Sequence, residues 1–419
     1  MSIIPAAVTP LDEHMGLDIA RSLGQHGIPV FGIDWHTQAV GRKSKYIQFV
    51  LSPDPKKEER KYVQFLIDWG KKQSTKTVLY PVSDDTALII SRERSQLEPY
   101  YEFVMPEHET LEQLSTKASL AQAGKACGIP TPKTVMTHDA QQVETVAPTF
   151  SYPVILKPIE SAYWHIPAIA SLLRENAFSG RAKVVLCHNA AELCDCYKKI
   201  AAHDPRMIIQ EVIPGPDENL AYISFYLDRT SKPLAMFAGR KIRVLPIEFG
   251  SASYVRSFCD PELERVAMRL LQHVHYQGLG GIEFKKDLRD GQYKLVEFNT
   301  RFGMWDGLAP RCGVDTPYIA YQDTLRQPVT PQLNYRENVI WIDWQRDVRA
   351  FWMYRKERGL RFTDWFNSLR GEKMWAVYDK KDWRPGVDLT LSLLNLAWSR
   401  VRRTRSSTLQ IKAQHLRGT

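Results

Sequence analysis

The stretch LVEFNTRFG, residues 295–303, carries a carboxylate, an amide and a guanidinium at alternating positions. These groups belong to Glu297, Asn299 and Arg301. The segment that leads into it, GGIEFKKDLRDGQYKLVEFN, holds a D-G pair that is typical of a β-hairpin turn. Pairing that is symmetric about this turn puts Glu283 opposite Glu297, to within about two residues in register. We therefore expect two carboxylates to face each other across one hairpin.

Two opposed carboxylates destabilise a sheet unless one is protonated or a cation lies between them. Asn299 projects from the same strand face as Glu297 and adds a neutral oxygen, and oxygen ligands of this kind suit Mg²⁺ bound together with substrate phosphates. Arg301 would then reach an oxyanion beside the metal through its planar fork. The alternative is a solvated sheet face on which Lys285 and Lys294 compensate the two acids. The complete array favours the metal site.

The composition is that of an ordinary folded chain. The 419 residues are 44% hydrophobic and 25% charged, which predicts two or three domains and argues against disorder. The N-terminus lacks a charged leader with an apolar core, and no run of about 18 apolar residues occurs, so we expect neither a secretion signal nor a membrane span. Six cysteines without C-x-x-C spacing favour reduced thiols in a cytoplasmic protein.

The net charge of +9 belongs to the C-terminal part of the chain. Residues 330–419 hold 18 Lys and Arg against 9 Asp and Glu, while the preceding residues balance at 38 against 38. A nucleic-acid enzyme more often carries its positive charge around its binding groove. We therefore expect no nucleic-acid partner and a basic C-terminal extension.

Residues 1–108 are expected to form a Rossmann-like domain. PAAVT, residues 5–9, and PVFGIDW read as strands on either side of a helix at residues 14–27, and this alternation continues to FVMP. It favours a parallel sheet covered by helices, and the lack of G-x-G-x-x-G after the first strand argues against dinucleotide binding. At the end of one predicted strand, Asp84 and Asp85 either bind an amine or cap the next helix. We favour the cap.

Residues 109–330 are expected to form a second domain of the α+β class. A helix is predicted to begin near Thr110 or Ser115 and to end at Gly128, with Lys117 in its first turn. The apolar runs beyond it, such as PVILKP and LAYISFYL, have the length of strands and are separated by Pro, Gly and Asp. This pattern predicts a mostly antiparallel sheet, so the whole chain combines α/β and α+β architecture.

Together, these residues resemble the ATP-grasp superfamily, and within it the carboxylate-amine ligases of the D-aspartate ligase type. The resemblance runs from residue 110 to about 325. It implies two lobes, divided near residues 210–214, that clamp ATP between them. It also implies that Glu283, Glu297 and Asn299 bind Mg²⁺ as two ions, with Mn²⁺ as an alternative.

The resemblance also implies roles for residues outside the metal array. Arg301 matches an arginine that is thought to hold the acyl or carboxy phosphate in some members. One or two cations of GRKIR, residues 239–243, would face the transferred phosphate or the carboxylate substrate, and we assign this role to Lys241 and Arg243. The residues implied for ATP are Lys117 and Lys157 at the phosphates, the backbone around Glu211, Val212 and Ile213 at the adenine, and Asp217 or Glu218 at the ribose.

One segment departs from the family pattern. Many members close a glycine-rich loop over the phosphates, whereas residues 159–183 of this chain contain one glycine, Gly180. Amides beside Ser179 and Gly180, or the hydroxyl of Ser161, are candidates to replace that loop. An aromatic cluster in the same segment either covers the site, stacks on a substrate or packs in the core. Its residues are Tyr163, Trp164 and His165.

The activity implied by the resemblance is that of an ATP-dependent ligase. A substrate carboxylate would attack the γ-phosphate to form an acyl phosphate, and an amine would then displace phosphate to form an amide. The implied partners are a small-molecule carboxylate and a small-molecule amine. Two alternatives stay open: a carboxylase-like or phosphate-transferring enzyme, and a non-catalytic ATP-binding regulatory protein.

Residues 331–419 lie outside the resemblance and form the expected basic, tryptophan-rich extension. The segment DLTLSLLNLAWSRVRRTR has apolar residues on one side and arginines at its end, which suits an anionic membrane surface. The competing interpretation, which we favour, is that its apolar residues pack on the catalytic domain. These residues are Leu391, Leu394, Trp398 and Val401. A partner in a cell-envelope pathway would fit both interpretations. We expect a cytoplasmic protein, with peripheral membrane contact as the alternative.

Overall fold

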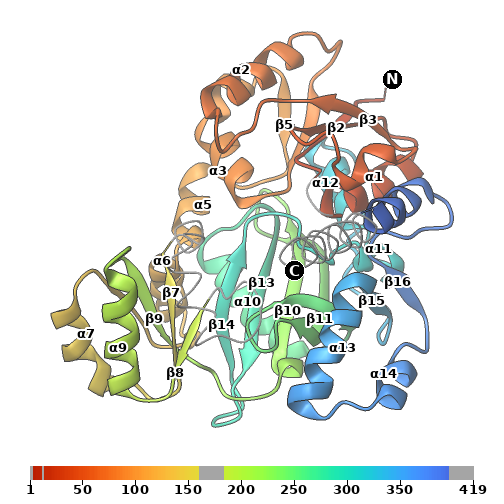
Figure 1. Cartoon of the computed structure of the whole chain (residues 1–419). Helices are drawn as coiled ribbons and strands as arrows, with labels where there is room; N and C mark the ends of the chain where they lie inside the picture. The colour runs from red at the N-terminus through yellow and green to blue at the C-terminus, as the bar shows by residue number, and fades with distance from the viewer. Residues whose placement is uncertain (1–2, 12–13, 160–183, 396–419) are drawn as a thin grey trace, which may run out of the picture.

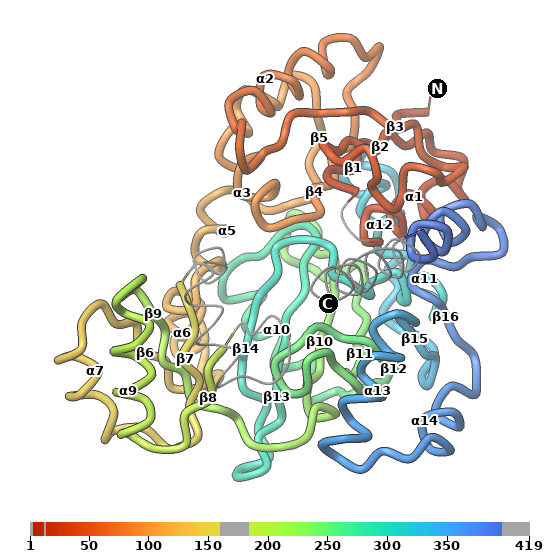
Figure 2. The backbone as a smooth tube through the Cα atoms, in the orientation of Figure 1, coloured from red at the N-terminus to blue at the C-terminus, as the bar shows by residue number. Residues whose placement is uncertain are grey.

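The computed structural model describes residues 3–11, 14–159 and 184–395. Within them the strands form sheets of five, four and seven strands, which lie as three neighbouring parts of one molecule (Figure 1). Figure 2 traces the backbone from the five-stranded sheet to the four-stranded sheet and then into the seven-stranded sheet. This mixed α/β architecture agrees with the class expected from the sequence.

The five-stranded sheet has the order β3-β2-β1-β4-β5, and its strands are parallel. They are β1 (Ala6–Thr9), β2 (Val30–Asp34), β3 (Ile47–Leu51), β4 (Thr77–Pro81) and β5 (Tyr101–Phe103). The intervening helices are α1 (Met15–Gln25), η1 (Val40–Lys43), α2 (Glu59–Gly70), α3 (Asp84–Arg92) and α4 (Arg94–Leu97). Ala6 and Val8 pack in one core and Ala7 and Leu79 in another, so helices cover both faces of the sheet. The predicted parallel sheet is therefore present.

The helix expected between residue 110 or 115 and Gly128 is interrupted. It consists of α5 (His108–Ser115) and α6 (Lys117–Ala126). Thr116 lies between them in an extended conformation, with φ −101° and ψ 149°, and its side chain accepts a hydrogen bond from the backbone N–H of Ser119. Thr116 is therefore the N-cap of α6, which makes Lys117 the first residue of that helix.

The four-stranded sheet has the order β6-β9-β7-β8, and its strands pair antiparallel. They are β6 (Thr134–Thr137), β7 (Val154–Pro158), β8 (Val185–Cys187) and β9 (Met207–Glu211). The helices α7 (Ala140–Val146) and α9 (Ala190–Ala201), with the short η2 (Ala147–Thr149), complete this part. A core of its own, which includes Val143, Leu156 and Leu193, holds it together as a separate lobe.

The seven-stranded sheet has the order β14-β13-β10-β11-β12-β15-β16. Its strands are β10 (Leu220–Leu227), β11 (Pro233–Leu245), β12 (Ser251–Ser257), β13 (Gly278–Lys286), β14 (Tyr293–Asn299), β15 (Ile340–Ile342) and β16 (Lys373–Trp375). Apart from the parallel pair β15–β16, neighbours are antiparallel, as predicted. Leu263 and Leu270 of α10 (Pro261–His273) pack in one core with Phe284. The remaining helices up to residue 330 are η4 (Asp217–Asn219), α11 (Leu308–Cys312) and α12 (Thr316–Thr324).

The boundary expected near residue 330 does not separate a C-terminal extension from this sheet. Strand β15 pairs with β12 on one side and with β16 on the other, because Ile340, Trp341 and Ile342 are all buried there. The helices α13 (Trp344–Arg358) and α14 (Phe362–Ser368) lie between these two strands in the chain. The region expected to be a separate extension therefore contributes the strands β15 and β16 to the large sheet.

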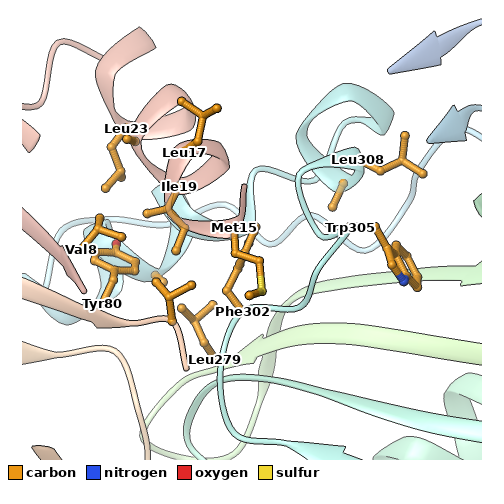
Figure 3. Close-up of a cluster of buried hydrophobic side chains, with 14 of the residues drawn as sticks. Val8, Met15, Leu17, Ile19, Leu23, Tyr80, Leu279, Phe302, Trp305 and Leu308 are labelled. Carbon is orange, nitrogen blue, oxygen red and sulfur yellow. The ribbon is translucent and has the colours of Figure 1, made fainter. Parts of the chain in front are cut away.

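A shared core joins the N-terminal sheet to the large sheet. Met15, at the start of α1, belongs to the same buried cluster as Phe302 and Trp305, which follow β14 (Figure 3). Leu279 of β13 and Tyr80 of β4 join this cluster. The segment that follows the β13–β14 hairpin is thereby packed against the N-terminal part of the chain.

The buried ion pair between Arg243 and Asp347 is expected to stabilise the attachment of α13 to β11. Arg243 donates to both carboxylate oxygens of Asp347, at 2.8 and 2.9 Å, and both side chains are at most 5% exposed. Asp347→Ala leaves a buried guanidinium unpaired, so we expect the free energy of unfolding to fall by about 3–5 kcal/mol. Urea denaturation followed by tryptophan fluorescence measures this change.

The matched control is Asp364→Ala, which removes an exposed pair with Arg361 on the neighbouring helix. It should leave the unfolding curve nearly unchanged, since exposed pairs contribute little. Equal effects of the two substitutions would contradict the assignment.

Candidate functional site

A cleft of about 780 Å³ lies between the four-stranded lobe and the β13–β14 hairpin. Its lining comes from four parts of the chain: the N-terminal part, the start of α6, the small lobe and the large sheet. The predicted site residues among the lining are Lys117, Lys157, Glu211, Val212, Ile213, Lys241, Glu283 and Glu297. The fold thus gathers most of the phosphate-, adenine- and metal-binding residues that the sequence predicted into one cleft.

A second groove, of about 730 Å³, lies between the N-terminal part and the opposite end of the large sheet. Cations such as Arg94 and Arg229 alternate in its lining with acids such as Glu102 and Asp323. It includes none of the predicted site residues, so we place the chemistry in the first cleft.

Glu283 and Glu297 are directly paired across the hairpin, which confirms the predicted register. A β-bulge at Val296 follows, because Phe284 pairs with Leu295 rather than with Val296. Leu295 and Phe298 consequently both pack in the core although they are three residues apart. The bulge turns Glu297 to the cleft face, where it stands opposite Glu283.

Ammonium groups hold the two opposed carboxylates. Lys241 of β11 forms a short ion pair with Glu283, and both side chains are nearly buried. The Nζ atom of Lys117 lies 3.6 Å from Oε1 of Glu297 and donates to the carbonyl oxygen of Val296 at 3.0 Å. The charge of Lys117, followed by those of Lys241 and other nearby cations, outweighs desolvation and lowers the pKa of Glu297 to about 2. Glu297 is therefore ionised at neutral pH.

Lys157 of β7 adds a third ammonium group from the small lobe. It donates to Oε1 of Gln210 at 2.8 Å. Burial, and then repulsion from Lys117, lower the pKa of Lys157 to about 8. An anion placed between Lys117 and Lys157 would offset this repulsion and raise the pKa of Lys157 again. The two lysines therefore suit a phosphate group.

Arg301 is held by the N-terminal part of the chain. Its Nε and Nη2 atoms donate to the two carboxylate oxygens of Asp84, at 2.8 and 3.0 Å. Ser83, rather than either aspartate, caps α3 through a capping box with Thr86, and Asp85 pairs with an exposed lysine. Asp84 also lines the cleft, so it joins the site as a residue that the sequence linked only to capping or amine binding.

Other predicted residues differ in their placement. Asn299 pairs with Gly281 in the hairpin, next to the two acids but not in the cleft lining. Glu211 lines the cleft, and its side chain accepts from Arg289 at 2.5 Å. The N–H of Val212 donates to Pro153 at 3.2 Å, so this amide is occupied within the protein.

The structure does not bring Arg243, Asp217 or Glu218 into the cleft. A β-bulge at Ile242 sends Lys241 and Arg243 to opposite faces of β11, and the guanidinium of Arg243 meets Asp347 instead. Asp217 is buried and accepts from the hydroxyl of Tyr354 and the N–H of Glu248. Glu218 is exposed. The expected roles of Arg243 at the phosphate and of Asp217 at the ribose are corrected accordingly, because their polar groups already have partners.

The lining also includes residues that the sequence analysis did not assign to the site, among them Lys285, Glu248 and Phe249. Lys285 appeared in the sequence analysis only in the alternative of a solvated sheet face, yet it lines the cleft, and burial lowers its pKa. Glu248 and Phe249, in the turn between β11 and β12, also line it. Glu248 and Phe249 belong to no sequence motif, so no local pattern indicated a role for them. The candidates Ser161, Tyr163, Trp164, His165, Ser179 and Gly180 lie outside the described residues.

The donor set fits a magnesium ion better than a transition metal. In the described part of the chain no three His, Cys, Asp or Glu side chains converge as a metal cluster. Two carboxylates with an adjacent amide instead match an ion that takes most of its ligands from phosphate and water. The site would then hold metal and nucleotide together.

No protein-family model matches the chain. Over 289 residues it is 25% identical to the D-aspartate ligase of Enterococcus faecium (strain Aus0004). The aligned region covers 67% of this chain and 65% of that protein. Over 203 residues it is 23% identical to a D-alanine–D-alanine ligase of Pseudomonas fluorescens (strain Pf0-1), covering 47% and 55%. The chain thus spans less than two thirds of the length of these curated relatives.

Solved structures share the fold at low identity. A biotin carboxylase–β-γ-ATP complex from Campylobacter jejuni aligns with a TM-score of 0.60 at 14% identity, covering 79% of this chain and 72% of that one. An L-amino acid ligase from Bacillus licheniformis aligns with a TM-score of 0.58 at 14% identity, covering 78% and 76%. The biotin carboxylase domain of the Hydrogenobacter thermophilus 2-oxoglutarate carboxylase, in complex with MgADP, reaches 0.59 at 16%, covering 81% and 74%. The mixed α/β fold expected from the sequence is thus shared with these solved structures.

The ammonium group of Lys117 is expected to control the pKa of Glu297. Without metal, Lys117→Met should raise this pKa from about 2 towards its ordinary value of 4.5. Because the folded-state pKa lies below 4.5, ionised Glu297 stabilises the fold above that pH, and this contribution is lost as the pH falls towards 2. A pH titration of the ¹³C carboxyl resonance in EDTA-treated protein measures the shift.

The matched control is Lys198→Met, which removes an exposed ammonium group paired with Glu144 on the outside of the small lobe. It should leave the pKa of Glu297 unchanged. A pKa that stays near 2 without Lys117 would show that another group holds this carboxylate.

Proposed function

We propose that this chain is a member of the ATP-grasp superfamily and an ATP-dependent ligase that joins a carboxylate to an amine through an acyl phosphate. One observation carries the proposal: two opposed carboxylates and four lysines line a single cleft between two lobes. The relatives named as D-aspartate ligase and D-alanine–D-alanine ligase support the same reaction class.

The chain's own residues would bind and orient the reactants. Lys117 and Lys157 would bind the phosphates of ATP, with the adenine against the backbone of residues 211–213. Mg²⁺, as one or two ions, would be held by Glu283, Glu297 and Asn299 and would neutralise phosphate charge. Lys241 and Arg301 would stabilise the charge that develops at the transferred phosphoryl group.

The ion pair between Arg301 and Asp84 has a place in this mechanism. In the structure the guanidinium of Arg301 donates to the carboxylate of Asp84. During the reaction the same guanidinium would bind another anionic group, either the substrate carboxylate or the acyl phosphate. Substrate binding would therefore displace Asp84 from Arg301. The five-stranded domain, Rossmann-like in its parallel order, would form this wall of the substrate site.

The remaining features of the proposal concern the setting of the enzyme. Residues 1–108 and 109–330 would both contribute to the cleft, and the strands β15 and β16 would support it by extending the large sheet. All six cysteines belong to the described residues and are free thiols, which agrees with a cytoplasmic location. The substrates would be a small carboxylate and a small amine, such as an amino acid or amino sugar.

The test is a screen for release of ADP and phosphate from Mg²⁺-ATP, with pooled amino acids, amino sugars and small carboxylates, followed by mass analysis. We expect release that requires one acid and one amine, and a product whose mass equals their condensation. Release driven by bicarbonate or by one acceptor alone would instead identify a carboxylase-like or phosphate-transferring enzyme. ATP binding without release in any pool would favour a regulatory protein.

Glu297→Gln should lower the rate of ADP release by on the order of 100-fold, because the neutral amide weakens binding of the metal that carries phosphoryl charge. The Mg²⁺ concentration for half-maximal rate should rise at the same time. Glu144→Gln, which changes an exposed carboxylate outside the cleft, should leave both quantities unchanged. Unaltered turnover of the Glu297 variant would overturn the metal assignment.

A further inference from the structure

An exposed aromatic surface lies on α13 and α14, the blue helices at the lower right of Figure 1. We call it the aromatic patch and define it as Trp352 of α13 with Phe362 and Phe366 of α14. These side chains are 63%, 55% and 54% exposed. Large aromatic residues at such exposure cost free energy in water, so a cluster of them marks a binding surface.

The three side chains form one continuous patch. The rings of Phe362 and Phe366 stack with centroids 6.2 Å apart. The buried Phe351 contacts Trp352 at 5.2 Å and Phe362 at 6.0 Å, between ring centroids. Trp352 and Phe362 therefore share the buried Phe351 as a base, and Phe366 joins them through Phe362.

This base is firmly attached to the fold. Trp365 packs on Phe351 at 5.0 Å and donates its indole N–H to Asp347 at 2.8 Å. Asp347 in turn holds Arg243 of the large sheet. The exposure of the patch is thus a property of a well-packed region rather than of a frayed end.

Unpaired cations surround Trp352 on the same helix. Arg349, Arg355 and Lys356 lie three or four residues from it, on the same helical face, and all three are exposed. Within the described residues they make no ion pair, whereas Arg358 pairs with Glu248 and Arg361 with Asp364. The patch therefore presents aromatic rings together with free positive charge.

A second apolar face occurs on residues 384–395, which are helical. Trp383, Val387, Leu391 and Leu394 recur at helical spacing and are 59%, 45%, 54% and 60% exposed. The expectation that Leu391 and Leu394 pack on the catalytic domain is therefore wrong, and Trp398 and Val401 lie outside the described residues. The 24 residues that follow contain six Lys and Arg and no Asp or Glu.

We propose that the aromatic patch and its cations bind the surface of an anionic lipid bilayer. Aromatic rings suit the boundary between headgroups and acyl chains, and each arginine or lysine near an anionic surface adds attraction. Stable peripheral binding usually takes two signals, and the exposed apolar face of residues 384–395 would supply the second. Rings and cations also suit single-stranded nucleic acid, but Val387, Leu391 and Leu394 offer no stacking surface to bases.

Binding would be peripheral. In the part of the chain that the structure describes, no helix has both the length and the apolar character needed to cross a membrane. The proposal stands independently of the ligase activity, since it rests on residues outside the cleft.

The test is cosedimentation of the full chain with sucrose-loaded vesicles of phosphatidylglycerol and phosphatidylcholine, and with phosphatidylcholine alone. We expect binding to the anionic vesicles that weakens with salt and is at least tenfold weaker on neutral ones. The variant Trp352→Ser/Phe362→Ser/Phe366→Ser and the variant Arg349→Ser/Arg355→Ser/Lys356→Ser should each lower the partition coefficient about tenfold or more. Thermal melts confirm that both variants remain folded.

The matched control is Leu51→Ser, which removes a side chain of similar exposure, 55%, from β3 on the N-terminal sheet; it should bind vesicles like the unchanged chain. Absence of vesicle binding, or binding that neither patch variant weakens, would overturn the proposal. So would a dimer in analytical ultracentrifugation, or capture of single-stranded DNA, that depends on the patch while vesicle binding does not.

Discussion

Two carboxylates that face each other across a hairpin are the constraint on which the site depends. Like charges directly opposed across a sheet are destabilising, so the pairing of Glu283 with Glu297 calls for positive charge beside them. The fold supplies it from two separate elements, with Lys241 arriving on β11 and Lys117 at the first position of α6. Lys157 adds a further charge from the small lobe, so the cleft holds more cations than these acids neutralise and suits a polyphosphate.

Single-residue irregularities decide which side chains enter this cleft. A bulge at Val296 keeps Leu295 and Phe298 in the core while Glu297 faces outward. Another bulge, at Ile242, separates Lys241 from Arg243, although a regular strand would place the two on one face. Each bulge inserts one extra residue, so the side chains beyond it point to the opposite face of the sheet. The bulges therefore decide which side chains of each strand face the cleft.

The C-terminal segment has two faces with different tasks. Its inner face completes the large sheet through β15 and ties α13 to β11 through Asp347. Its outer face leaves aromatic rings exposed, together with cations that make no ion pair within the described part of the chain. From its basic composition the C-terminal segment resembles a solvated tail. In the fold, one set of its residues packs against the large sheet and another set is exposed on the surface.

The sequence by itself determined the hairpin, its opposed acids and the alternation of the N-terminal sheet, because turn residues and side-chain periodicity act over a few positions. It also placed Lys117 and Lys157 among the phosphate-binding candidates through the resemblance. Only the tertiary structure decided that Asp84 holds Arg301, 217 residues away, and that Asp347 holds Arg243. Such partners depend on strand order and on bulges, which no local pattern encodes, since they arise when distant segments pack together.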